Sequence, residues 1–321
     1  MLKIHYKQID LTQKHLEKIY LQKLQQKEFF IIGIEVFDNE ISQFCHLNID
    51  PQHNNSKNDS SITALEMVFK LKSDLKEAAY GFNNILLLTI KCDLDSISAI
   101  SLVTMVLKSK FEINGDLILR LKAISLSDRH GMANEWKPNI RYDHFNLVSY
   151  TKYGIPVSLI TIIGDINLNI NYKIKTMTDY LLYGEFKDSE KYNQKAITKL
   201  SYIKSSTSHK VIIPEKLIFV ESTYRGAIGF GYKKAPIVIA KNPKYAFGKK
   251  NNRIYGNKYT IAQYKENYIE LDKIKDRVNK LEPGWGGSFV IIGSPQTNPS
   301  IIKQDDLIDL VKEYVNAESG I

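Results

Sequence analysis

The feature that most constrains the fold is the segment of residues 85–104, ILLLTIKCDLDSISAISLVT. An apolar run of strand length is followed by two aspartates, Asp93 and Asp95, and then by a run of apolar and small residues. This pattern predicts a buried strand, a short acidic turn and a helix. Both carboxylates would then lie at the carboxyl end of a strand, where open α/β sheets bind their ligands.

Two further apolar segments end in an acid and a histidine. The pairs are Asp50 with His53, after residues 46–49, and Asp128 with His130, at the end of 116–131. We expect both segments to be strands, so that three junctions meet at one edge of a parallel sheet. Helix capping or a turn would explain any one of these aspartates. Their recurrence at three junctions favours a binding or catalytic site.

The other N-terminal segments predict a mainly parallel sheet with helices on both faces. Apolar residues at helical spacing predict a surface helix over 10–28, and a second helix is expected to begin at Ser60 or Ser61 as its cap. Continuous apolar runs predict strands over 29–36 and 41–50. Helical spacing returns between Val157 and Leu200.

The C-terminal region predicts a smaller, strand-rich α/β domain. Turn residues separate short strand-like segments, which are 216–222, 226–232, 236–243, 258–264 and 289–293. Helices are expected over 271–281 and 303–314. We therefore place an α/β domain over 1–170, a helical bridge over 171–209 and the second domain over 210–321.

The positive charge is concentrated in the second half of the chain. The formal net charge is +9, while residues 201–260 alone carry 12 Lys and Arg against 2 Glu, a net of +10. Such asymmetry favours an anionic partner, most simply a nucleotide or short nucleic acid. A solvated basic face without a specific partner is the alternative.

Several classes of protein are excluded by spacing. The two cysteines, Cys45 and Cys92, form no C-x-x-C pair, so neither a disulfide framework nor a zinc ribbon is expected. The glycines around 284–293 match neither the dinucleotide nor the P-loop pattern, and no G-x-S-x-G elbow or HExxH motif occurs. Without a secretory signal or a long apolar run, we expect a cytoplasmic protein that does not enter a membrane.

These motifs resemble those of the DHH phosphoesterase superfamily. Asp93-x-Asp95 before a small-residue helix is similar to its D-x-D motif, and IDPQHNN…SSITALE is similar to its name-giving motif. GWGGS before a strand is similar to the glycine-rich element of the DHH-associated C-terminal domain. The chain departs from the family in motif order and in Thr89, Pro51-Gln52-His53 and Ser288, which stand where histidines are usual.

The resemblance implies a metal-dependent phosphoesterase that hydrolyses a phosphodiester of a nucleotide or short single-stranded nucleic acid. The implied cofactor is Mn²⁺ or Mg²⁺, at a site that could hold two ions. The implied ligands and catalytic groups are Asp50, His53, Asp93, Asp95, Asp128 and His130. The implied substrate-binding residues are Arg225, Lys233, Lys234, Gly286, Gly287 and Ser288.

Two other functions are consistent with the same residues. The departures at Thr89 and at residues 51–53 are also expected of a catalytically degenerate protein that only binds nucleotide or nucleic acid. A small-molecule enzyme with a basic pocket for an acidic substrate is a further alternative. The glycine cluster itself has a simple structural explanation as a tight turn before a strand.

Overall fold

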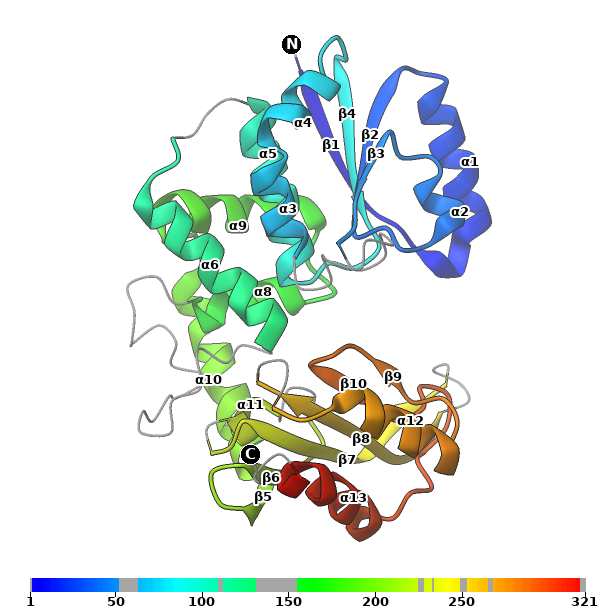
Figure 1. Cartoon of the computed structure of the whole chain (residues 1–321). Helices are drawn as coiled ribbons and strands as arrows, with labels where there is room; N and C mark the ends of the chain where they lie inside the picture. Colours follow the sequence, from blue (N-terminus) through cyan, green and yellow to red (C-terminus); the bar gives the residue numbers. More distant parts are fainter. Residues whose placement is uncertain are drawn as a thin grey trace. The chain divides into compact units, whose positions relative to one another are not determined.

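The chain forms two compact α/β units, seen in a computed structural model (Figure 1). The structure describes residues 2–51, 63–108, 112–130, 155–224, 228–232, 234–248, 253–264 and 268–317. Unit 1 comprises the described residues of Met1–Arg129 and Leu147–Ala196, and unit 2 comprises those of the rest of the chain. No helix in these described ranges is long and apolar enough to cross a membrane.

Unit 1 is built on a four-stranded sheet in which every pairing is parallel. In order across the sheet, the strands are β1 (Lys3–Gln8), β4 (Asn84–Thr89), β2 (Phe29–Ile34) and β3 (Leu47–Ile49). The apolar runs predicted to be strands therefore form the two central strands, where both faces are buried. β1 was not predicted, because its sequence KIHYKQ is half polar, as suits an edge strand.

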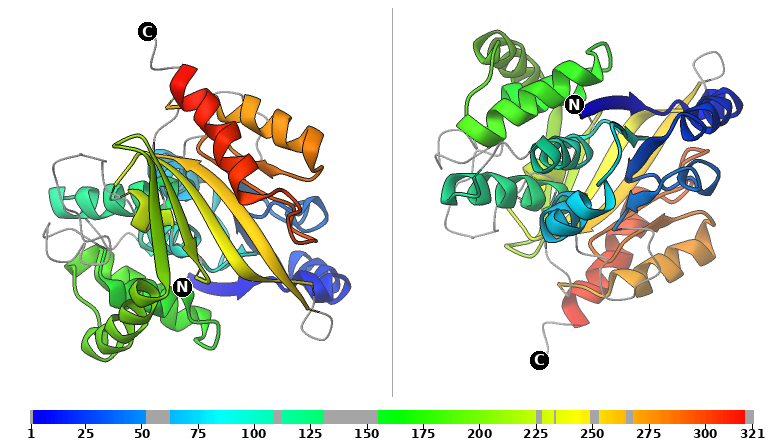
Figure 2. Two further views of the ribbon diagram at one scale, coloured as in Figure 1. Left: turned by 90° about the horizontal axis from the view of Figure 1, so that it is seen from below. Right: turned by 90° about the horizontal axis from the view of Figure 1, so that it is seen from above.

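Helices cover both faces of this sheet (Figure 2). On one face lie α1 (Lys14–Gln25) and α2 (Asn39–Ser42), whose Leu21 and Ile41 pack with Leu86 of β4. The helices that share the core of the other face are α3 (Ala64–Lys70), α4 (Lys72–Ala78), α5 (Leu94–Lys108), α6 (Gly115–His130), α8 (Val157–Gly164) and α9 (Ile170–Tyr183). Helix α10 (Ser189–Ser205) belongs to both units: its residues up to Ala196 are counted in unit 1 and those from Ile197 in unit 2.

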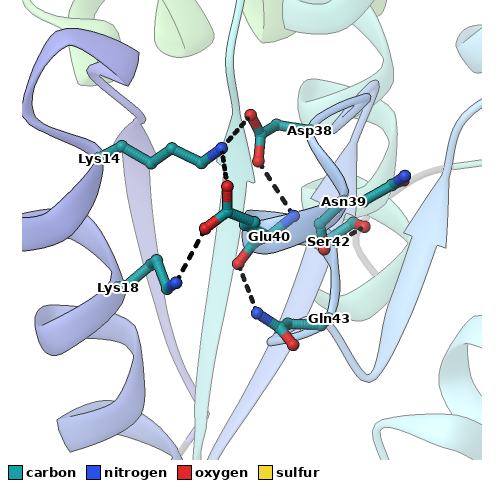
Figure 3. Close-up of polar contacts among 7 residues, drawn as sticks. All are labelled: Lys14, Lys18, Asp38, Asn39, Glu40, Ser42 and Gln43. Carbon is teal, nitrogen blue, oxygen red and sulfur yellow. Dashed lines mark hydrogen bonds and ion pairs between the residues drawn. The ribbon is translucent and has the colours of Figure 1, made fainter.

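An exposed ion-pair network joins α1 to α2 (Figure 3). The Lys14 ammonium lies 2.9 Å from an Asp38 carboxylate oxygen and 2.5 Å from one of Glu40, and Lys18 reaches the other Glu40 oxygen at 2.9 Å. Hydrogen bonds from both lysines lower the pKa of Glu40 to about 2. These pairs fix the orientation of α2 more than they stabilise the fold, because water screens them.

Unit 2 contains a six-stranded mixed sheet. In order, its strands are β5 (Thr207–Ile213), β6 (Leu217–Ser222), β7 (Ile237–Phe247), β8 (Ile254–Gln263), β10 (Ile291–Gly293) and β9 (Gly286–Gly287). Only β6 and β7 pair in parallel. Two amphipathic helices, α12 (Leu271–Leu281) and α13 (Gln304–Ala317), share one core with the sheet, and α11 (Ile228–Tyr232) shares the core of the opposite face.

The α/β class and the order of a parallel sheet followed by a strand-rich sheet are confirmed. Two predicted strands are wrong, because 116–131 forms helix α6 and 226–232 contains the short helix α11. In α6 the buried residues Leu117, Leu121 and Ile124 recur at helical spacing, a period that the predicted strand overlooked.

Two boundaries in the first half also differ from the prediction. The strand expected over 41–50 is confined to β3, because residues 39–42 form α2. Helix α3 begins at Ala64 and is capped by Thr63, whose hydroxyl accepts a hydrogen bond from the Glu66 amide at 3.4 Å. Ser60 and Ser61, the expected caps, lie outside the described residues.

Candidate carboxylate site

Acidic residues lie in the segments that follow the carboxyl ends of three neighbouring strands of unit 1. Glu35 follows β2, Asp50 follows β3, and Asp93 and Asp95 follow β4. The parallel pairing of these strands places all four acids at one edge of the sheet. Asp128, on α6, lies close enough to raise the pKa values of Glu35 and Asp95. The structure thus brings together four of the predicted residues and adds Glu35.

Asp128 reaches this edge from a helix rather than from a strand. The sequence analysis placed it at the carboxyl end of a third strand, and that placement is wrong because 115–130 is helical. His130 is the last residue of the same helix, and its side chain is outside the description, as is the whole of His53. The described part of the site is therefore made of carboxylates.

Glu35 is the member of the site that sequence reasoning missed. Its backbone is left-handed, with φ of 53°, and its amide donates to the carbonyl of Ile49 at 2.9 Å. A left-handed non-glycine residue is costly, and such residues concentrate at functional sites. The sequence did contain a signal for it. Glu35 directly follows the apolar run FFIIGI, just as Asp50 directly follows the segment 46–49.

The hydroxyl of Ser96, on the first turn of α5, links two of the acids. Its Oγ contacts Glu35 Oε2 and lies 2.8 Å from Asp93 Oδ1, which also accepts the Ser96 amide at 3.0 Å. A hydroxyl has one proton to donate, so it can satisfy both carboxyl groups only if one of them is protonated. Burial, Asp93, Asp128 and Asp50 together raise the pKa of Glu35 to about 7, against the opposing Ser96 hydrogen bond. With a pKa of about 7, Glu35 is protonated about half of the time at neutral pH and can then donate to the Ser96 hydroxyl.

Asp95 is buried, with 1% of its surface exposed. Its carboxylate accepts hydrogen bonds from the first amides of α3, Ala64 at 2.9 Å and Leu65 at 3.3 Å. Burial first, and then the charges of Asp128 and Glu35, raise its pKa well above the usual value, while the bond from Ala64 opposes this. Asp95 thus anchors the start of α3 and also belongs to the acidic cluster.

Among the described residues, no lysine, arginine or histidine forms an ion pair with Glu35, Asp93 or Asp95. Lys173 is buried in the same unit, but its ammonium donates to the carbonyl of Ile163 at 2.7 Å. Glu35, Asp93 and Asp95 are therefore three neighbouring acids without a basic partner among the described side chains.

A hard divalent cation would suit these donors in chemistry, because carboxylate oxygens are the ligands that Mg²⁺ and Mn²⁺ prefer. In geometry the fit is partial. Within the described residues, no three His, Cys, Asp or Glu side chains lie close enough to hold one ion together. The carboxylates thus have the chemistry and charge that such a cation requires, but the described side chains do not form a complete coordination site.

Thr89 occupies the position where the family resemblance leads one to expect a histidine. It is the last residue of β4, is fully buried, and donates its hydroxyl to the carbonyl of Lys91 at 2.9 Å. This bond shapes the turn that carries Asp93. Thr89 therefore serves the backbone of the site rather than supplying a ligand.

The predicted substrate residues of unit 2 fall into three groups. Arg225 and Lys233 lie outside the described residues. Lys234 is exposed just after α11. Gly286 and Gly287 form β9, and Ser288 follows it, exposed, with its amide donating to the Ile291 carbonyl at 2.8 Å.

The glycine turn has a structural role of its own. Gly287 has φ of 144°, and a Cβ there would lie 2.1 Å from the carbonyl oxygen of Ile291. The side-chain oxygen of Asn279 accepts hydrogen bonds from the amides of Gly284 and Trp285, at 2.9 and 3.0 Å. The structural explanation of this turn is thus sufficient by itself, while the open space at Gly286 leaves room for a ligand.

Three aromatic residues of unit 2, Tyr232, Phe247 and Tyr255, differ in whether a base could stack on them. Tyr232 and Phe247 are buried, with 6% and 1% of their surfaces exposed, so they belong to the packing of the unit. Tyr255 is 63% exposed and is the one of the three that a base could reach.

Comparison with known proteins does not assign the chain to a family. No family model matches the chain, and no curated protein is significantly similar to it. The resemblance to DHH phosphoesterases rests on the quoted residues alone, and the case for function depends on the geometry of the carboxylate site.

Proposed function

We propose that this protein is a metal-dependent phosphoesterase that hydrolyses a phosphodiester of a nucleotide or short single-stranded nucleic acid. The observation that carries the proposal is the convergence of Glu35, Asp50, Asp93, Asp95 and Asp128 at one sheet edge. Bringing like charges close together is unfavourable, and a bound cation would relieve the repulsion between Glu35, Asp93 and Asp95. Such perturbed acids concentrate at functional sites.

The individual acids suit different tasks in this reaction. A bound Mn²⁺ or Mg²⁺ would polarise a phosphoryl oxygen of the substrate and activate a water molecule. Asp93 is exposed and can reach such an ion, while Asp95 is held in place by the α3 amides. Glu35, with a pKa of about 7, is suited to proton transfer near neutral pH.

The basic charge of residues 201–260 supports a phosphate-bearing substrate. In this proposal Lys234 and the turn of Gly286, Gly287 and Ser288 would contact the substrate, together with Arg225 and Lys233. His53 and His130 would complete the ligand set. We place the reaction in the cytoplasm, in keeping with two free cysteines.

A second candidate is a binding protein that retains the fold without the reaction. Two observations favour it: the Asp95 carboxylate is already engaged by Ala64 and Leu65, and Thr89 supplies no imidazole. Such a protein would bind nucleotide or nucleic acid through charge and would lose affinity steeply as salt is raised.

Metal analysis and a substrate panel separate the two candidates. Protein purified without chelator is analysed for Mn²⁺ and Mg²⁺ and assayed on dinucleotides, cyclic dinucleotides and short single strands, with and without EDTA. We expect bound or titratable Mn²⁺ and hydrolysis that EDTA abolishes. Salt-sensitive binding with no metal and no hydrolysis of any diester would overturn the proposal in favour of the binding protein.

A further inference from the structure

A cavity of about 210 Å³ lies between α3 and α6 of unit 1, beside the carboxylate site. Its apolar walls are formed by Leu65 and Phe69 of α3 and by Ile118 and Leu121 of α6. Glu66 also lines the cavity, and its carboxylate accepts a hydrogen bond from the Ser125 hydroxyl. Lys70 and Lys122 lie at the cavity on the same two helices, and both are exposed. Nothing in the acidic cluster requires an apolar cavity, so its role needs a separate explanation.

The cavity and the acidic cluster are held by the same two helices. On α6, Leu121, Ser125 and Asp128 follow one another along one side, from the cavity wall to the cluster. Seven residues of α-helix rise about 10 Å. The Ser125 hydroxyl donates to Glu66 of α3 at 2.5 Å and so ties the two helices together between these points. The cavity wall at Leu121 and the acid at Asp128 are thus two turns apart on one side of α6.

The start of α3 is fixed by the site itself. Asp95 accepts the amide of Leu65, and Leu65 is also part of the cavity wall. Any ligand of the cavity would therefore contact a helix whose first turn is anchored by one of the acids.

The charges at the cavity indicate what kind of ligand it fits. Neither Lys70 nor Lys122 has an ion-pair partner among the described residues, and the Lys72 ammonium lies 5.0 Å from the centroid of the Phe69 ring. Apolar walls with free ammonium groups at the opening match a flat ring that carries hydrogen-bond acceptors and is joined to an anion. A nucleobase attached to a phosphate has these properties.

We propose that the α3–α6 cavity binds the base of the nucleotide whose phosphoester lies at the carboxylate site. This inference rests on the proposed function for the identity of the ligand, and adds the place where the base is recognised. Phe69 and Leu121 contact the faces of the ring, and Lys70 and Lys122 donate to its acceptor atoms or to the adjoining phosphate.

Saturation-transfer NMR with probes that contain no phosphodiester, in metal-free buffer, tests base binding without the proposed reaction. The probes are adenosine 5′-monophosphate, cytidine 5′-monophosphate and ribose 5-phosphate, which lacks the base. The variants are Leu121→Trp, which fills the cavity, and Phe69→Ala, which removes one wall. Leu119→Trp is the matched control, because Leu119 is on the same helix, is 41% exposed and does not line the cavity.

We expect the base protons of both nucleotides to receive the strongest saturation, and the nucleotides to bind about tenfold more tightly than ribose 5-phosphate. Leu121→Trp and Phe69→Ala should remove this difference, while Leu119→Trp should retain it. Since a bulky residue at Leu121 can disturb packing, thermal unfolding of each variant is measured alongside, and Phe69→Ala gives an independent result.

The possible outcomes separate this inference from the proposed function. Nucleotides that bind no better than ribose 5-phosphate, or base binding that both cavity variants leave intact, would overturn the cavity assignment even if the enzyme hydrolyses diesters. Base binding lost in both variants, in a protein that hydrolyses no diester, would support the cavity assignment and reject the phosphoesterase.

Discussion

The two units treat buried charge in opposite ways. In unit 1, Glu35 and Asp95 are surrounded by other acids, which raise their pKa values. In unit 2, Glu282 is also buried, but it accepts hydrogen bonds from the Trp285 indole at 2.8 Å, the Ser300 hydroxyl at 2.7 Å and the Ile301 amide at 2.6 Å. Glu282 is surrounded by hydrogen-bond donors, whereas Glu35 and Asp95, although each is also hydrogen-bonded, lie against other acids that repel them.

This difference separates a structural charge from a functional one. A charge that serves the fold is buried together with its hydrogen-bond partners, because an unpaired buried charge is costly. A cluster of like charges destabilises the fold, and is expected where a ligand of opposite charge compensates it. Changing acids in the two units should therefore have opposite effects on stability.

The largest expected effect is on activity. Asp93→Asn removes one negative charge but keeps an oxygen to accept the Ser96 amide, so the start of α5 should remain capped. We expect hydrolysis with Mn²⁺ to fall about 100-fold or more, as when one preorganised electrostatic group is removed. The measurement is kcat/KM on the best diester of the panel.

Asp74→Ala is the matched control for this variant, since Asp74 is an exposed acid of α4 in the same unit. Its activity should remain at the wild-type level. Equal activity in Asp93→Asn and wild type would mean that Asp93 contributes to the fold alone, and would remove the main support for a reaction at this edge.

The next effect concerns the stability of unit 2. Glu282→Ala leaves three donors without their acceptor, and we expect it to lower the free energy of unfolding by about 3 kcal/mol. Glu282→Gln keeps an acceptor in the same place and should lose less than half of that. Urea denaturation followed by tryptophan fluorescence measures this, since Trp285, one of the two tryptophans, is a hydrogen-bond partner of Glu282. A loss no larger for alanine than for glutamine would contradict the structural role.

The corresponding change in unit 1 should stabilise. Glu35→Gln removes a charge that burial and three neighbouring acids oppose. Because the pKa of Glu35 rises from 4.5 to about 7 on folding, the native state binds the extra proton between these values, and wild-type stability should fall as pH rises through this window. The variant lacks this loss and should gain about 1–2 kcal/mol at pH 8.

The same variant gives a second test through pH. Measured in metal-free buffer, wild type and Glu35→Gln should differ little at pH 4.5 and increasingly up to about pH 7. A difference that is independent of pH would show that Glu35 affects stability through packing, and would weaken the contrast between the two units.

The sequence predicted the edge of the parallel sheet well because its signals are local. A buried strand followed by acids, as at Asp93 and Asp95, needs only the apolar run and the turn to be recognised. Asp50 was found in the same way. Glu35 was missed although its run was identified as a strand, because the prediction extended that strand to residue 36 and thereby placed Glu35 inside it.

What the sequence could not give depends on tertiary packing. Asp128 was predicted for the site from a strand that is a helix, and it lies near the other acids because α6 packs beside α3, a contact that its own segment does not encode. The sequence also does not distinguish the buried Tyr232 and Phe247 from the exposed Tyr255, because burial depends on the packing of the whole unit. The edge strand β1 has too few apolar residues to distinguish it from a loop.

The smallest effect is expected at Lys258, the buried cation of unit 2. Its ammonium donates to the carbonyls of Ser294 and, at 3.0 Å, of Pro295. Burial lowers its pKa from 10.5 to about 8, against the opposing charge of Glu282, so the unfolded chain binds more protons between these values. Wild-type stability should therefore rise slightly as pH increases from 8 towards 10.5.

Lys258→Met should cost about 1 kcal/mol at pH 7, since it loses two hydrogen bonds but no longer buries a charge, and should remove this rise. Urea denaturation of wild type and Lys258→Met at pH 7 and pH 9.5 measures the cost of the substitution and the change of stability with pH. If Lys258→Met lowered the free energy of unfolding as much as Glu282→Ala, the lysine rather than the glutamate would organise the buried polar network of unit 2.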